Sequence, residues 1–295
     1  MKKIFSIVAM ILLLGVSAFA EAEKSTKLLE TSRFPVLIGL ILFAFVIIYY
    51  IQKAKSGQHI FIRRIAGLNA IDDALGRATE MGKPVLYVPG IGGISELQTL
   101  ASISILGHIA KKTASYETDL YVPLRDPMVY STATEVVRES YLGAGRPDAF
   151  RENMVEFLTS DQFGYVAGVD GYMVRENPAA NFYLGSFWAE SLILAETGNS
   201  VGSIQIAGTA NPSQLPFFIA SCDYTLIGEE LYAAGAYLST DPKSKGSLKG
   251  QDMGKLAVMI VIIVFALLNV VRNATGMESL SNMLNWLDKF FAMKG

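Results

Sequence analysis

The residues best suited to chemistry stand in one glycine-rich segment. Gly90-Ile91-Gly92-Gly93-Ile94-Ser95 follows the apolar run Val85–Val88 and leads into Glu96. Glycines let backbone N–H groups approach a phosphate, and the N-terminus of a following helix adds favourable partial charge. This context is typical of a dinucleotide-binding G-x-G-x-x-G loop, with Ser95 in place of the last glycine. A tight turn without a ligand, whose Ser95 and Glu96 only cap the helix, explains the same residues.

Further polar residues close the neighbouring apolar runs. Asp126 could hold a ribose, although it lies 36 residues beyond Gly90 and the usual spacing is about 20. Asp170 either lines a site or belongs to a solvated turn. No catalytic residue is assigned, and the sequence names no cofactor. The candidate ligand-binding residues are Gly90, Gly92, Gly93, Ser95, Glu96, Arg125, Asp126, Asp170, Thr209 and Asn211.

Metal and nucleophilic chemistry find little support. The histidines, His59 and His108, have no Cys or second His at ligand spacing. Cys222 has no histidine base near it in the sequence, which predicts a buried thiol. As the single cysteine, it also excludes a disulfide within the chain. We therefore expect no metal site, and the sequence favours a protein that is not an enzyme.

Short apolar runs that end in turn residues must position the candidate site. They predict strands at Val85–Val88, Leu120–Val122, Phe163–Val166 and Ser203–Ile206. Helices are expected at Leu68–Met81, Ile94–Thr113, Val129–Leu142, Pro147–Leu158, Phe187–Glu196 and Pro216–Leu238. This alternation predicts an α/β fold, Rossmann-like, with a mostly parallel sheet, helices on both faces and the loops gathered at the carboxyl ends of the strands. If Asp170-Gly171 is instead a hairpin turn, the sheet is mixed.

Three apolar runs without charged residues, 4–20, 34–51 and 256–271, predict how the chain meets a membrane. Residues 1–20 have the pattern of a signal peptide or an uncleaved N-terminal anchor. Residues 34–51 and 254–271 are each long enough to cross a bilayer. Between them, residues 56–250 form the predicted α/β domain. Residues 277–293 form an amphipathic helix, which lies in the membrane interface or packs against a neighbouring subunit.

Charge predicts the orientation of these segments. Eight basic residues flank the α/β domain, against four on the far sides of the two spans: Lys53, Lys55, Arg63, Arg64, Lys243, Lys245, Lys249 and Lys255. The positive-inside rule then places the domain in the cytoplasm and the C-terminal helix outside the inner membrane of a prokaryote. Residues 56–254 carry 14 basic and 22 acidic side chains. This acidity argues against a nucleic-acid partner.

Two resemblances follow from quoted segments. Pro89–Glu96 is similar to the P-G-G-x-G-T-x-x-E loop of nucleotide-sugar hydrolases with lysine-decarboxylase-like folds, but the glutamate stands one residue short and the threonine is missing. That loop implies a phosphate contact and a catalytic glutamate. Arg77–Pro84, running into Pro89–Gly93, and Ala207–Ala210 resemble an uncharacterised family of prokaryotic membrane proteins defined by a domain of unknown function. The second resemblance covers about residues 62–238 and implies a membrane-tethered cytoplasmic domain without a known activity.

The sequence therefore predicts a membrane-anchored α/β scaffold or ligand-sensing domain that is not catalytic. Small residues in Ala233-Ala234-Gly235-Ala236 and the amphipathic C-terminus suit a homo-oligomer. Membrane lipid and a membrane protein complex are the other expected partners. The alternative is a membrane-bound nucleotide-binding enzyme or sensor that uses Gly90–Gly93.

Overall fold

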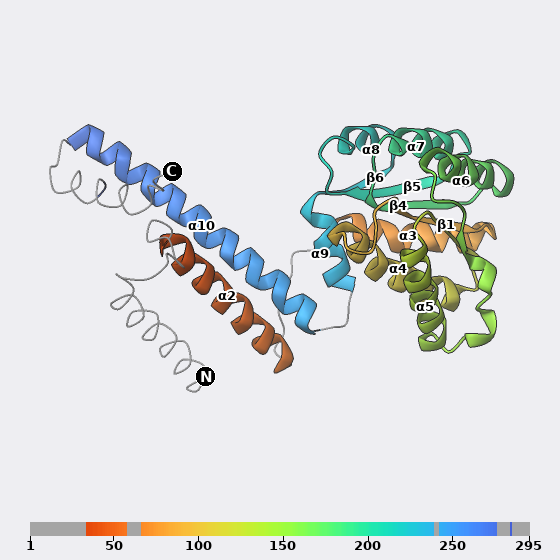
Figure 1. Cartoon of the computed structure of the whole chain (residues 1–295), viewed down its shortest axis with the longest axis horizontal. Coiled ribbons are helices and arrows are strands. Elements are labelled where there is room, and N and C mark those ends of the chain that lie inside the picture. Colours follow the sequence, from red (N-terminus) through yellow and green to blue (C-terminus); the bar gives the residue numbers. More distant parts are fainter. Residues whose placement is uncertain (1–33, 58–65, 239–241, 276–283, 285–295) are drawn as a thin grey trace, which may run out of the picture. The chain divides into compact units, whose positions relative to one another are not determined.

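The chain divides into two compact units in a computed structural model, which describes residues 34–57, 66–238, 242–275 and Leu284. The α/β unit comprises residues 50–249, and the helical unit comprises residues 1–49 together with residues 250–295. Figure 1 labels the elements of both units. The expected signal segment, residues 1–20, lies outside the described residues, as does the expected C-terminal helix, residues 277–293, apart from Leu284.

Within the α/β unit, the described residues form a six-stranded sheet in the order β3-β2-β1-β4-β5-β6. Every neighbouring pair is parallel, so the expected parallel sheet is confirmed and the mixed one is wrong. The order reverses between β1 and β4, which creates the switch point of a doubly wound fold. The strands are β1 (Val85–Gly90), β2 (Leu120–Leu124), β3 (Val155–Phe157), β4 (Ala180–Ser186), β5 (Ile204–Thr209) and β6 (Tyr224–Ile227).

Helices cover both faces of the sheet (Figure 1). One face carries α3 (Ala66–Met81), α4 (Leu97–Tyr116), α5 (Pro127–Gly143) and α9 (Glu229–Leu238). The other carries α6 (Gln162–Glu176), α7 (Glu190–Ser200) and α8 (Leu215–Ser221). Because successive side chains of a strand point to opposite faces, Tyr87 belongs to the first core and Leu86 and Val88 to the second. This coverage explains why the strand sequences are almost continuously apolar.

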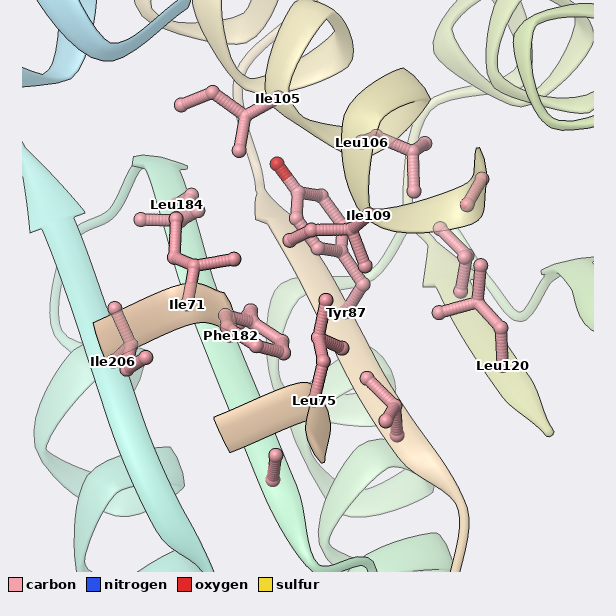
Figure 2. Close-up of a cluster of buried hydrophobic side chains, with 14 of the residues drawn as sticks. Ile71, Leu75, Tyr87, Ile105, Leu106, Ile109, Leu120, Phe182, Leu184 and Ile206 are labelled. Carbon is pink, nitrogen blue, oxygen red and sulfur yellow. The ribbon is translucent and has the colours of Figure 1, made fainter. Parts of the chain in front are cut away.

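The first core surrounds two aromatic side chains of the central strands. Figure 2 shows Tyr87 and Phe182 between apolar residues of α3 and α4. The Tyr87 hydroxyl donates to the carbonyl oxygen of Ser102 at 2.6 Å, so even its polar atom is satisfied in the core. Apolar packing and this hydrogen bond therefore join β1 to α4, the helix that follows it.

Four sequence expectations about elements are wrong. Phe163–Val166 is not a strand but the start of α6, where the Asp161 carboxylate accepts from the Gly164 N–H and caps the helix. Asp170-Gly171 lies inside the same helix, so no hairpin turn forms there. The strand that the sequence places at Phe163–Val166 is instead β4, at Ala180–Ser186. Pro147–Leu158 contains two 3₁₀ turns, Pro147–Ala149 and Glu152–Met154, followed by β3. Pro216–Leu238 is divided into α8, β6 and α9.

In the helical unit, two helices are long and apolar enough to cross a membrane. They are α2 (Phe34–Lys55) and α10 (Pro242–Thr275), with candidate spans Val36–Lys55 and Lys245–Arg272. The expected segments 34–51 and 254–271 lie within these helices. Gly250 and Gly254 of α10 meet α2 closely, since a Cβ on them would lie 2.8 Å from the Cα of Ile47 and 2.3 Å from the ring of Phe43. Small residues four apart allow such close helix packing in lipid.

Candidate functional site

Ligands of parallel α/β sheets bind beyond the carboxyl ends of the strands, at the point where the strand order reverses. Here that point lies between β1 and β4. We call the ends of β1, β2, β4 and β5, with the loops that follow them, the carboxyl edge. Of the ten candidate residues, nine lie at this edge, and Asp170 does not.

Position 90 requires a glycine because the backbones of β1 and β4 lie in close contact there. It has a φ of +85°, and a Cβ on it would lie 2.2 Å from the carbonyl oxygen of Ser186. That same oxygen accepts a hydrogen bond from the Ile91 N–H at 2.9 Å. Gly185 on β4 mirrors the arrangement, because its Cβ would lie 2.0 Å from the carbonyl oxygen of Pro89. The first glycine of the fingerprint thus lets β1 and β4 approach each other.

Gly92 lies beside the start of α4, next to the carboxylate of Glu96. A Cβ on Gly92 would be 2.6 Å from Thr99 Oγ1 and 2.7 Å from Glu96 Oε2. A negative group beside a helix N-terminus is favourable, so Glu96 lies where a phosphate would gain from the same helix. Thr99 Oγ1 is buried without a hydrogen-bond partner in the described part of the chain. Gly93 is less crowded, with Asp126 Oδ2 at 3.8 Å from its ideal Cβ, and Ser95 is exposed.

Arg125 and Asp126 hold the loops around β2. Asp126 Oδ1 accepts from the N–H groups of Met128 and Val129, both at 2.9 Å, and so caps α5. Arg125 donates from Nε to the carbonyl oxygen of Ser160 at 2.9 Å and from a terminal nitrogen to that of Ile91 at 3.2 Å. The residue expected to bind a ribose is therefore engaged as a helix cap.

Thr209 and Asn211 join β5 to α4 and to the loop after β4. Gln98 Oε1 accepts from Thr209 Oγ1 at 3.1 Å and from the Ala210 N–H at 2.8 Å. Asn211 donates from Nδ2 to the carbonyl oxygen of Phe187 at 3.1 Å. Sequence reasoning missed Gln98, and its place in the first turn after the glycine loop was the available signal.

Sequence reasoning also missed a buried carboxylate at this edge. Glu190, the first residue of α7, is fully buried. Its Oε1 accepts from the Trp188 N–H at 2.8 Å, and its Oε2 accepts from Gln162 Nε2 at 2.5 Å. Burial, and then the nearby Glu190 carboxylate, raise the pKa of Tyr165 well above its ordinary value. The Tyr165 hydroxyl donates to the carbonyl oxygen of Pro123 at 3.0 Å, so this group too joins neighbouring segments.

Asp170 lies away from the edge, in the middle of α6 and not in a turn, so it is not placed beside the other nine candidates. Burial raises its pKa to about 6, and a hydrogen bond with Thr197 of α7 opposes that rise. Burial also raises the pKa of the part-buried Cys222 to about 12, which keeps it a thiol. Within residues 34–57, 66–238 and 242–275, no group of three or more His, Cys, Asp or Glu side chains could hold a metal ion.

Large exposed apolar side chains stand near the starts of the helices that follow the carboxyl edge. Helices α4, α5 and α6 each begin with one within two residues of the start, and Trp188 precedes α7. Their exposed fractions are high: Leu97 71%, Met128 64%, Phe163 62% and Trp188 60%. We call these four residues the apolar rim. Large exposed apolar side chains of this kind are candidates for an interaction surface.

The fold defines the class of protein as a Rossmann-like α/β domain joined to two helices able to cross a membrane. The chain belongs to the family defined by the domain of unknown function DUF6754, whose model matches residues 24–280. The expected membership of an uncharacterised family is thereby confirmed. Comparisons with curated proteins and with solved structures find no match. The resemblance of Pro89–Glu96 to lysine-decarboxylase-like hydrolases stays a hypothesis.

Proposed function

We propose that this chain is a membrane-anchored, non-catalytic scaffold that self-associates through the apolar rim of its carboxyl edge. One contrast at that edge carries the proposal. Arg125, Asp126 and Asn211 bond to the chain's own backbone, whereas the apolar rim stays exposed. A catalytic or nucleotide site would instead need polar groups free to turn towards a ligand.

Two members of the apolar rim stand on adjoining segments. Gln162, next to Phe163, bonds to Glu190, and the same carboxylate bonds to the Trp188 N–H. Each large apolar side chain that leaves water contributes about 1.5–3 kcal/mol. Burying Phe163 and Trp188 together would therefore favour association substantially.

A second copy of the chain is the partner that the two spans favour. Copies anchored in one bilayer share their orientation and meet at a raised effective concentration. Copies of equal orientation suit a closed, cyclic assembly. The small residues of α9, expected from sequence to form this contact, are used within the chain: Ala234 is buried and a Cβ on Gly235 would lie 3.3 Å from the carbonyl oxygen of Ala101. The apolar rim takes their place in the proposal.

The α/β unit is proposed to face the cytoplasm of a prokaryotic cell. Lys53 and Lys55 end α2, Lys243 and Lys245 begin α10, and Arg272 lies near the far end of α10. Basic residues concentrate on the cytoplasmic side of membrane spans. A reporter that is active only in the periplasm, fused after Gly250, should therefore stay silent. Activity of that reporter would contradict this orientation.

The mass of the detergent-extracted full-length chain tests self-association. We expect an oligomer for the wild type at micromolar concentration by light scattering. The double variant Phe163→Ser/Trp188→Ser should be monomeric, because it removes the apolar area of two adjoining residues. Val174→Ser is the matched control, since Val174 is 61% exposed at the opposite end of α6. A monomeric wild type, or a double variant that remains oligomeric, would contradict the proposal.

Nucleotide sensing is the second candidate, favoured by the strand order and by the loop that joins β1 to α4. It would require the Glu96 carboxylate to leave its place beside Gly92. Thermal shift of the full-length chain with ATP, NAD and cyclic dinucleotides tests it. A ligand at 100 times its Kd stabilises a protein by about 2.7 kcal/mol. We expect no shift, and a shift that Gly92→Ala abolishes would place this candidate first.

A further inference from the structure

A cleft of about 230 Å³ lies at the end of the sheet opposite the carboxyl edge. It is bounded by the end of α4, the start of β2, the end of α5 and the turns that precede β3. Six of its lining residues carry ionisable side chains: Glu117, Asp119, Tyr141, Arg146, Asp148 and Arg151. None of them belongs to the candidate site described above.

Charges of both signs alternate around the cleft. The Arg146 guanidinium bonds to the Glu117 carboxylate and lies 3.6 Å from Asp148 Oδ1, and Arg151 pairs with Asp119. A guanidinium has five N–H donors, so each arginine keeps donors beyond those its carboxylate uses. The three carboxylates are 68–73% exposed and can accept further hydrogen bonds.

A buried tyrosine lines the same cleft. Tyr141 is 1% exposed, and its hydroxyl oxygen makes no hydrogen bond of normal geometry among the residues that the structure describes, although the Thr113 side chain lies close enough to lower its pKa. A buried donor that stays unpaired is costly, so such groups in native proteins call for an explanation. Burial raises the pKa of Tyr141, which keeps the phenol a neutral donor near pH 7.

We infer that this cleft binds a small zwitterion of the α-amino acid class. The ligand's carboxylate would accept from the Tyr141 hydroxyl and from a guanidinium of the cleft. Its ammonium group would donate to the carboxylates of the cleft. A ligand with charge of one sign would be attracted by the cleft residues of opposite charge and repelled by those of like charge. The cleft of about 230 Å³ holds the volume of roughly eight water molecules at about 30 Å³ each, which limits the ligand to the size of a small metabolite. This inference does not rest on the proposed self-association.

Calorimetry on the detergent-extracted full-length chain tests the inference, with each of the common amino acids up to about 10 mM, ten times a millimolar Kd. We expect saturable binding of at least one free amino acid. Its N-acetyl and methyl ester derivatives, each lacking one charge, should bind at least about tenfold more weakly. Inorganic phosphate, an anion without a cationic group, serves as the probe that carries charge of one sign, and it should not bind.

Tyr141→Phe removes the donor and should weaken binding by about tenfold or more. Tyr130→Phe is the matched control, since it lies on the same helix outside the cleft lining and should bind as the wild type does. Three results would overturn the inference: no amino acid binds, a blocked derivative or phosphate binds equally well, or binding survives Tyr141→Phe unchanged.

Discussion

At the carboxyl edge, Gln98, Arg125 and Asn211 each bond to groups of neighbouring segments. At the opposite end, Tyr141 lines a cleft of about 230 Å³, and its hydroxyl makes no hydrogen bond of normal geometry among the described residues. The first region is where parallel sheets of this topology usually bind ligands. Topology thus indicates where a site can form. At the carboxyl edge these three side chains are engaged within the chain, whereas the buried Thr99 Oγ1 has no partner among the described residues.

The difference arises from how each region is built. The carboxyl edge is closed by two strand ends in backbone contact, Gly90 against Ser186, and by the Glu96 carboxylate beside Gly92. The opposite end is bounded by ion pairs on exposed side chains, which contribute little to stability and can exchange partners. A closed, bonded region suits a rigid scaffold, and an open, charged one suits reversible binding.

The largest expected effect tests whether Gly90 closes the carboxyl edge. Gly90→Ala must fit a Cβ against the Ser186 backbone at a positive φ, and we expect a loss of about 3 kcal/mol or more of unfolding free energy. For a unit of this size that corresponds to a Tm lower by roughly 6–12 °C. Thermal unfolding of the full-length chain measures it. Gly93→Ala, with 3.8 Å of space, is the control, and equal Tm values for the two variants would contradict this account of the edge.

A smaller effect compares a bonded polar group with a less well bonded one. Gln98→Met leaves Thr209 Oγ1 and the Ala210 N–H without their acceptor and should cost about 1–2 kcal/mol. Tyr141→Phe removes a hydroxyl that makes no hydrogen bond of normal geometry and has the Thr113 side chain close to it, so the ligand-free protein should lose less stability than Gln98→Met does. Tm values in detergent without added amino acid provide the comparison. A Tyr141→Phe variant as destabilised as Gln98→Met would mean that the hydroxyl has a structural partner, which would weaken the contrast between the regions.

The smallest effect concerns Asp170, which belongs to neither region. Burial raises its pKa in the folded chain from 3.8 to about 6. Folding therefore favours the protonated carboxyl, and the resulting stabilisation is present at low pH and lost as the pH rises from about 4 through 6. The asparagine side chain does not titrate, so the Asp170→Asn variant does not lose this stabilisation as the pH rises. The Tm of the variant minus the Tm of the wild type should therefore increase over that pH range. A difference that is independent of pH would contradict the role of Asp170.

Local patterns in the sequence predicted much of the fold. The apolar runs at the starts of β1, β2 and β5 are correctly assigned, because short buried strands closed by turn residues carry a local signal. Two uncharged runs predicted α2 and the apolar part of α10 for the same reason. The failures have physical causes too: Phe163–Val166 and β4 are both short, aromatic and apolar, and β3 has three residues. Periodicity cannot separate such segments.

The sequence by itself determined the fold class, the apolar runs long enough to cross a membrane and the edge at which nine of the ten candidate residues lie, since each depends on residues near one another in the chain. Only the tertiary structure decided what those residues do. Gly90 meets Ser186, and Gln98 meets Ala210, across separations that no local pattern reports. The cleft beside Tyr141 likewise requires α4, α5 and β2 to come together. Backbone approach, hydrogen-bond pairing and burial are properties of contacts between distant segments, and they exist only once the sheet has assembled.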